Sequence, residues 1–320
     1  MRFSCHVLAL ICASAAQLAL AQTYPTRPVR VIVTFPPGAG SDISTRLVTA
    51  KLSESLGKPF VIDNRAGAAG NIGVDMAAHA APDGYTLLAV TASAAISQSA
   101  YAKAPFDLDR DFAPVALTAS APFILALHPS IPARSFQELI ALAKSKPGQY
   151  SYATPGTGSS PHMAGELLKM ETGIDILHVP YKGTVPAVAD VIAGNVSMAL
   201  ANTLVALPHV KSGRLRGVAI TSAKRSAIAP DLPTIAESGV RGFESGTWYG
   251  FLAPVRAPRT VITKLNGEIV RIVQLADVRE KLAAQGAEPL TGTPEHAGAF
   301  VRGEIARWAK VVKAAGIRLE

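Results

Sequence analysis

The stretch Phe35-Pro36-Pro37-Gly38-Ala39-Gly40-Ser41-Asp42 follows an apolar run at residues 29–33 and precedes a helix-like pattern that starts at Ile43. A strand that ends in a Gly-rich turn and opens a helix points several unpaired backbone N–H groups at one place. The helix dipole makes that place attractive to an anion. The turn lacks the Lys of a phosphate-binding loop, and its glycines do not fit the dinucleotide fingerprint. It therefore indicates a site for a small carboxylate or a similar group rather than for a nucleotide.

The rest of the chain alternates short apolar runs with amphipathic helix patterns, which predicts α/β layers around parallel sheets. In the first part we expect strands at residues 29–34, 60–63 and 85–90, with helices at 42–56 and 71–80 between them. Further along we expect a helix at 135–145, a strand at 150–153, a helix at 159–171, a strand at 175–179, a helix at 184–193 and strands near 197–201 and at 215–221.

Two extended segments interrupt this alternation. Residues 112–127 read as two extended pieces in succession, 114–118 and 123–127, with no helix between them. A later extended segment at 247–253 precedes closing helices at 260–275, 277–285 and 294–315. If these segments carry the chain from one lobe to the other and back, they form a hinge beside a ligand cleft. We therefore expect one lobe from residues 22–121 plus 248–320 and a second from residues 122–247.

The first 21 residues are predicted to be a cleaved secretory signal. Arg2 gives a positive start, residues 7–20 are apolar, and Ala19-Leu20-Ala21 is a small-residue cleavage site. The apolar stretch is short for a membrane span, although an uncleaved anchor is the alternative. We expect an exported, periplasmic protein.

The composition argues against several function classes. Cys5 and Cys12 both fall inside the signal, so the mature chain is expected to have no disulfide, no Cys metal site and no Cys nucleophile. The net charge of +8 is spread along the chain without an aromatic-studded basic stripe, which argues against nucleic-acid binding. The seven His residues show no metal-ligand spacing, and no sequence motif indicates a cofactor.

Three further turns have the character of the opening one. They lie at residues 64–71, 154–159 and 178–183, each after a predicted strand, where ligands bind in open α/β sheets. Gly and Ser are also ordinary turn and cap residues, and for any single turn that explanation is preferred. Four such turns divided between two lobes nevertheless predict a site that lines the cleft.

Several residues in these turns have competing interpretations. Ser159 and His162 stand three apart at a helix start and could form a nucleophile and base, but the Gly-x-Ser-x-Gly elbow is missing. We favour an N-cap Ser with a first-turn His that bonds across the cleft. Asp42 complements the helix dipole or touches the ligand. Lys182 pairs with a carboxylate or is simply solvated, and Trp248 walls the cleft or belongs to the core.

Taken together, the motifs resemble those of the substrate-binding receptors of tripartite tricarboxylate transporters, often called Bug proteins. The resemblance covers essentially the whole mature chain. It rests on residues 24–28, 35–42, 64–73, 83–87, 156–159 with His162, 178–183, Trp248, Gly250 and 253–254. It implies a two-lobed periplasmic-binding-protein fold (Venus-flytrap, type II), with a mainly parallel, helix-flanked sheet in each lobe and two crossover strands as the hinge. It also implies no enzymatic activity.

The resemblance implies a function and a set of ligand-binding residues. The function is the capture of a small organic carboxylate and its delivery to membrane permease subunits, by a protein that we expect to be a monomer. The first two turns would form the carboxylate cradle, and the second lobe would close over it. The residues expected to bind ligand are Phe35, Gly38, Ala39, Gly40, Ser41, Asp42, Ala68, Ala69, Gly70, Asn71, Ser93, Thr157, Gly158, Ser159, His162, Pro180, Tyr181, Lys182, Asn202 and Trp248.

The chain departs from the family pattern at two positions. Ala39 stands where Gly is usual, which reduces backbone freedom. Ala201 stands where the family usually has Asp, and we take this as a hypothesis for a less polar ligand. Two other functions stay open at this point: an exported serine hydrolase that uses Ser159 and His162, and a ligand-sensing partner of a signalling system.

Overall fold

The computed structural model of the protein describes residues 24–317, apart from residues 102, 228, 285 and 315. The predicted signal at residues 1–21, with Cys5 and Cys12, lies outside the described residues. Within them, no helix is both long enough and apolar enough to cross a bilayer.

The first lobe is built from βα units in which three strands pair in parallel, in the order β2-β1-β3. Each strand is followed by a helix that begins at the carboxyl end of the sheet. The elements are β1 (Val29–Val33), α2 (Gly40–Leu56), β2 (Phe60–Asn64), the 3₁₀ turn η2 (Ala68–Gly70), α3 (Asn71–Ala78), β3 (Thr86–Thr91) and α4 (Ala92–Ala100). Helix α4 was not expected from the sequence.

One long strand, β4 (Phe112–Leu127), belongs to both lobes. It pairs antiparallel with β9 (Gly246–Pro254) as far as Pro122, and from Phe123 onward with β7 (Met198–Asn202). The expectation of two separate extended pieces was therefore wrong in detail. Because both halves of the segment have neighbours to bond, the chain stays extended along its whole length, with two register shifts in its pairing with β9.

The second lobe repeats the βα arrangement. Its parallel strands run in the order β7-β5-β6, and β8 pairs with the far end of β4. The elements are α5 (Phe136–Ser145), β5 (Ser151–Thr154), α6 (Ser160–Thr172), β6 (Leu177–Pro180), α7 (Thr184–Ile192), β7, α8 (Thr203–Lys211) and β8 (Arg216–Ile220). Helix α8 was also not expected.

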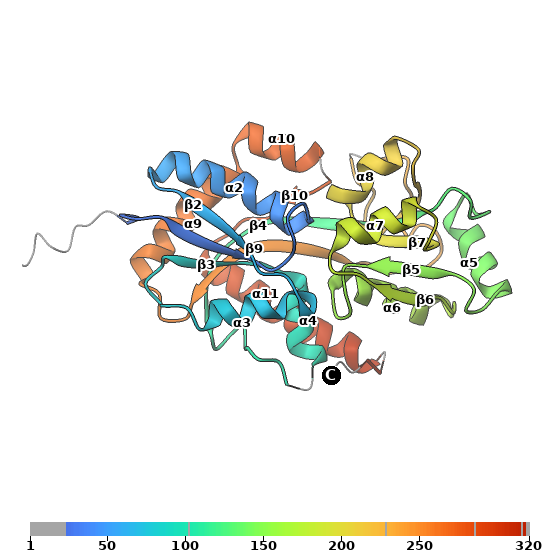
Figure 1. The fold of residues 1–320 in the computed structure, drawn as a ribbon, viewed down its shortest axis with the longest axis horizontal. Coiled ribbons are helices and arrows are strands. Elements are labelled where there is room, and N and C mark those ends of the chain that lie inside the picture. Colours follow the sequence, from blue (N-terminus) through green and yellow to red (C-terminus); the bar gives the residue numbers. More distant parts are fainter. Residues whose placement is uncertain (1–23, 102, 228, 285, 315, 318–320) are drawn as a thin grey trace, which may run out of the picture.

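The closing segment returns to the first lobe, where helices cover both faces of the sheet. Helices α2, α9 (Arg259–Val273) and α10 (Ala276–Ala284) lie on one face, while α3, α4 and α11 (Pro294–Ala314) lie on the other (Figure 1). The short strand β10 (Glu288–Pro289) pairs with β4. Neighbouring residues of β1 point to opposite faces of the sheet. Val31 belongs to the same hydrophobic cluster as Leu52 of α2, whereas Ile32 belongs to the same cluster as Val301 of α11.

The predicted two-lobed α/β fold is confirmed, with more antiparallel pairing than expected. The consecutive βα strands are parallel, whereas every pairing made by β4, β9 or β10 is antiparallel. A strand that carries the chain between lobes and one that brings it back must run in opposite directions, so the hinge makes both sheets mixed.

An apolar cluster also joins the lobes beside the hinge. Met163 of α6 packs with Ile96 of α4 and Trp308 of α11, and all three side chains are buried. Full burial of a side chain of this size contributes about 1.5–3 kcal/mol. The lobes are therefore also joined by an apolar contact between α6 and helices α4 and α11.

Candidate ligand-binding site

A small cavity lies between the lobes where five helices begin. The N-termini of α2 and α4 from the first lobe meet those of α6, α7 and α8 from the second. The cavity has a volume of about 20 Å³, which is enough for about one or two water molecules. Its lining residues are Phe35, Ala39, Gly40, Ser41, Thr91, Ser93, Pro155, Ser160, Pro161, Thr184, Asn202, Thr247 and Tyr249.

The opening turn brings the α2 backbone close to the other lobe. A Cβ added to Gly40 would lie 2.5 Å from the Asn202 Nδ2 and 2.6 Å from the Tyr249 hydroxyl, so any larger residue would have to displace one of these side chains. Ala39 is the N-cap residue with φ −69° and ψ 159°, an extended conformation that any residue adopts. The Ala at this position therefore costs no backbone strain.

Asp42 holds this turn from within and does not line the cavity. Its carboxylate accepts hydrogen bonds from the Gly38 N–H (2.9 Å), the Asn64 amide (3.0 Å) and the Arg46 guanidinium (2.9 Å). Burial raises the pKa of this carboxyl, but the hydrogen bonds from Arg46, Gly38 and Asn64 outweigh it, so the pKa lies below its usual value. The structure therefore favours a role of Asp42 in holding the turn over a contact between Asp42 and the ligand.

The second turn, at residues 64–71, packs against Thr34 and Phe35, which lead into the opening turn. Ala68 and Ala69 have φ of 46° and 54°, a left-handed conformation that is uncommon for a residue with a side chain. A Cβ on Gly70 would lie 3.1 Å from the Thr34 side chain and 3.5 Å from the Phe35 ring. The buried Asn71 Oδ1 has no hydrogen-bond partner among the described residues. Through Phe35, this turn shapes one wall of the cavity without lining it.

Two polar contacts connect the walls of the cavity. The Ser160 N–H donates to the Ser93 Oγ across the cleft at 3.1 Å. The Asn202 amide donates to the Tyr249 hydroxyl at 2.8 Å. Burial raises the pKa of Tyr249, which keeps the phenol neutral. The Ser41 Oγ is buried without a partner in the described structure, so it is available to a ligand.

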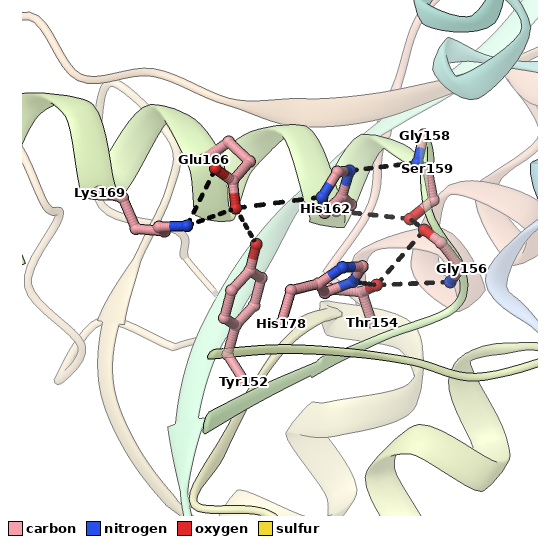
Figure 2. A network of polar contacts seen from close by, with 9 residues as sticks. All are labelled: Tyr152, Thr154, Gly156, Gly158, Ser159, His162, Glu166, Lys169 and His178. Carbon is pink, nitrogen blue, oxygen red and sulfur yellow. Dashed lines mark hydrogen bonds and ion pairs between the residues drawn. The ribbon is translucent and has the colours of Figure 1, made fainter. Parts of the chain in front are cut away.

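The turn before α6 explains Ser159 and His162. The N-cap role of Ser159 is confirmed: its Oγ accepts from the His162 N–H, at 3.4 Å, and also donates to the Gly156 carbonyl at 2.6 Å. The expected bond from His162 across the cleft was wrong, because its Nδ1 accepts the Gly158 N–H of the same turn (Figure 2). In this arrangement the Ser159 hydroxyl does not use the imidazole as a base, which removes the geometric support for a hydrolase.

The remaining predicted residues lie away from the cavity lining. Thr157 is exposed at the tip of its turn, Pro180 is exposed at the end of β6, and Lys182 is exposed just after this strand. The Tyr181 hydroxyl donates to Asp190 of α7 at 2.5 Å. Trp248 belongs to the core, where its indole N–H donates to Glu304 of α11 at 3.1 Å.

Six predicted residues therefore line the cavity: Phe35, Ala39, Gly40, Ser41, Ser93 and Asn202. Sequence reasoning missed seven: Thr91, Pro155, Ser160, Pro161, Thr184, Thr247 and Tyr249. Thr91, Ser160 and Thr184 share a signal that could have found them. Each is a hydroxyl residue at the point where a strand or turn gives way to a helix.

The electrostatics of the cavity come from backbone and hydroxyl groups. Among the described lining residues there is no Asp, Glu, Lys, Arg or His. Over residues 24–317 as described, no group of three or more His, Cys, Asp or Glu is arranged to hold a metal ion. The converging helix N-termini still give the cavity a positive electrostatic potential, because the effects of their unpaired N–H donors and of the helix dipoles add up at this point.

Residues 44–317 match the sequence profile described as "Tripartite tricarboxylate transporter family receptor". The chain belongs to this receptor family. The receptor is 40% identical over 302 residues to Protein BugT of Bordetella pertussis (strain Tohama I), which covers 94% of this chain and 93% of BugT. The predicted resemblance to Bug proteins is confirmed.

Two solved structures of similar proteins contain a carboxylate. R. palustris Rpa4515 with adipate has a TM-score of 0.90 at 38% identity, covering 92% of this chain and 99% of that one. MatC from Rhodopseudomonas palustris with bound malate has a TM-score of 0.86 at 32% identity, covering 90% and 100%. The fold is therefore shared with two proteins whose structures contain adipate and malate.

Proposed function

We propose that the chain is an exported periplasmic receptor that captures a small organic carboxylate in the interlobe cavity. It delivers the carboxylate to the membrane subunits of a tripartite tricarboxylate-type transporter. The observation that supports this is the convergence of five helix N-termini on one cavity that has hydroxyl groups and no charged side chain among its described lining residues. Such a site favours an anion, and its described lining has no carboxylate, imidazole or amine for acid–base chemistry.

We propose the lobes to be residues 22–121 plus 248–320 and residues 122–247, in a monomer. Because the cavity holds only about 20 Å³, entry of a carboxylate requires the lobes to separate about β4 and β9. Donors from both lobes then contact the ligand only after closure, so closure is stabilised by the ligand. The cavity-lining residues make this contact, and the turns at residues 68–71 and 156–159 position them.

The lining also supports a ligand class. An ammonium group that enters a closed cleft needs a carboxylate or several acceptors, and its burial without them is costly. The described lining offers no carboxylate, and Asp42 is already occupied by three donors. Ala201 is buried in β7 and provides none. We infer that the ligand is a carboxylate without an amino group, as are the adipate and malate bound to the two related receptors.

The test begins with native mass spectrometry of freshly purified protein, followed by calorimetric titration with matched pairs. The pairs are adipate with 2-aminoadipate and succinate with aspartate. We expect at least one deamino acid to bind about tenfold or more tightly than its amino partner. Tighter binding of the amino form would overturn the ligand class.

Two variants separate the site from the rest of the surface. Ser41→Ala removes a buried hydroxyl of the cavity, whereas Ser145→Ala makes the same change on the exposed end of α5. We expect only the first to weaken binding. If no carboxylate is carried or bound by the folded protein, the proposed function is wrong.

A further inference from the structure

A network of hydrogen bonds contacts the turn at residues 156–159, which precedes α6 (Figure 2). The Gly158 N–H donates to the His162 Nδ1 at 3.1 Å. The Ser159 Oγ donates to the Gly156 carbonyl at 2.6 Å, and the Thr154 Oγ1 bonds to the His178 Nε2 at 2.6 Å. His162 thus bonds to the turn of residues 156–159, which contains two glycines with positive φ, and His178 bonds to Thr154 just before this turn.

The two imidazoles lie against each other and face one charged pair. Their ring centroids are 4.1 Å apart. Glu166 accepts from the Tyr152 hydroxyl at 2.6 Å and from Lys169 at 3.0 Å, and its Oε1 is 4.0 Å from the His162 Nε2. These side chains, from α6, β5 and β6, are the titratable groups that face His162 in the described structure.

The hydrogen bond from Gly158 determines the protonation state of His162. A ring nitrogen that accepts a backbone N–H carries no proton, so the proton is on Nε2, toward Glu166, and the imidazole is neutral. A second proton on Nδ1 would place two N–H groups head to head. Burial lowers the pKa of His162, and it prevails over the opposing effect of Glu166.

The turn at residues 156–159 lies between two residues that line the cavity. Pro155 precedes it and Ser160 follows it, and both line the cavity. Ser160 also donates the hydrogen bond to Ser93 that joins the lobes. A shift of residues 156–159 therefore displaces a cavity wall and an interlobe contact together.

We propose that His162 is a positioning residue that, as a neutral acceptor, holds the 156–159 turn in its ligand-binding form, and that protonation of its Nδ1 in acid releases this turn and weakens binding. The proposal rests on the proposed function, because the cavity that the turn shapes is the proposed anion site. His162 itself does not line the cavity.

The first test needs no ligand. Hydrogen exchange of the Gly158 amide is measured by NMR at about pH 7 and about pH 4.5, each corrected for the intrinsic rate. In the wild type we expect the protection factor to fall about tenfold or more on acidification. The Oδ1 of His162→Asn can accept the same bond but cannot titrate, so protection should be kept at both pH values. His162→Leu should lack this protection of the Gly158 amide at both pH values, and His79→Asn, a change at an exposed residue, should behave as wild type.

Equal acid sensitivity in wild type and His162→Asn, or none in wild type, would overturn the proposal. The wild-type arm remains decisive even if the Leu variant does not fold. The second test titrates adipate, or the carboxylate found on the purified protein, into the same variants. We expect about tenfold weaker binding by His162→Leu and rescue by His162→Asn. If no carboxylate binds to any variant, the proposed function fails, whereas the exchange data still decide the role of His162.

Discussion

The backbone N–H of Ser160 donates to the Oγ of Ser93 over 3.1 Å, and this bond joins the first turn of α6 to the first turn of α4 across the cleft. The two hydroxyls are also 3.4 Å apart. Helix N-termini carry unpaired donors, so an N–H that meets a partner in the other lobe stabilises the closed arrangement.

Ser93→Ala should shift the lobes toward the open form. Because a lost neutral hydrogen bond in a buried site costs about 1 kcal/mol, we expect about fivefold weaker carboxylate binding with little change of the fold. Calorimetric titration measures the affinity, and small-angle scattering without ligand measures the opening. Ser145→Ala on α5 is the control, and equal affinity of both variants would contradict the role of this contact.

Gly40→Ala should block closure. The new Cβ would lie 2.5 Å from the Asn202 Nδ2 and 2.6 Å from the Tyr249 hydroxyl, which are held by their mutual hydrogen bond. We expect a loss of affinity of about 1–3 kcal/mol, as for other overpacked sites. Gly267→Ala places the same methyl group where nothing lies within 4 Å and should leave binding unchanged. Wild-type affinity in the Gly40 variant would show that the lobes do not close as described.

Asp42→Asn should destabilise the opening turn at neutral pH. The folded-state pKa of Asp42 lies below its usual value, so its contribution is present above about pH 4 and is lost as the pH falls through the folded pKa. Loss of a hydrogen-bonded charge costs about 1–3 kcal/mol, and solvent near the turn screens part of it.

The measurement for Asp42 is thermal unfolding of both proteins between neutral pH and about pH 3. The difference in Tm should shrink as the solution becomes more acidic. The matched control is Asp231→Asn, which changes an exposed carboxylate outside the helices and strands and should shift Tm little. A difference that stays constant with pH would contradict an ionic role for Asp42.

His178 should make the fold acid-sensitive. Burial first, then the neighbouring His162, lowers the pKa of its imidazole to about 3. The unfolded chain therefore binds more protons than the folded one below about pH 6.5, and the free energy of unfolding falls as the pH decreases. The upper limit is about 1.4 kcal/mol per pH unit, reduced by solvent screening of a partly buried ring.

Urea unfolding of wild type and His178→Gln at about pH 7 and about pH 5.5 measures this effect. The variant should lose less stability between the two pH values than the wild type. His79→Asn, a change at an exposed imidazole, should retain the wild-type dependence. An equal loss in all three proteins would assign the acid sensitivity to other groups.

The alternation of apolar runs and helix patterns predicted most elements of the fold to within a few residues. Two helices were missed for physical reasons. Helix α4 is buried on most of its surface, so its Ala- and Ser-rich sequence has no amphipathic stripe. Helix α8 contains Pro208, which reads locally as a helix breaker. In both cases packing against the sheet overrides the local signal.

For the site, the sequence by itself determined which turns open helices at the carboxyl ends of strands, since Gly, Ser and Asp act on the backbone within a few residues. It did not determine which side chains reach the cavity. Ser160, Thr184 and Tyr249 meet there only because β4 and β9 bring two lobes together, and His162 turns inward because Gly158 offers it a donor. These contacts join residues far apart in the chain or depend on a turn conformation, so only the tertiary structure decides them.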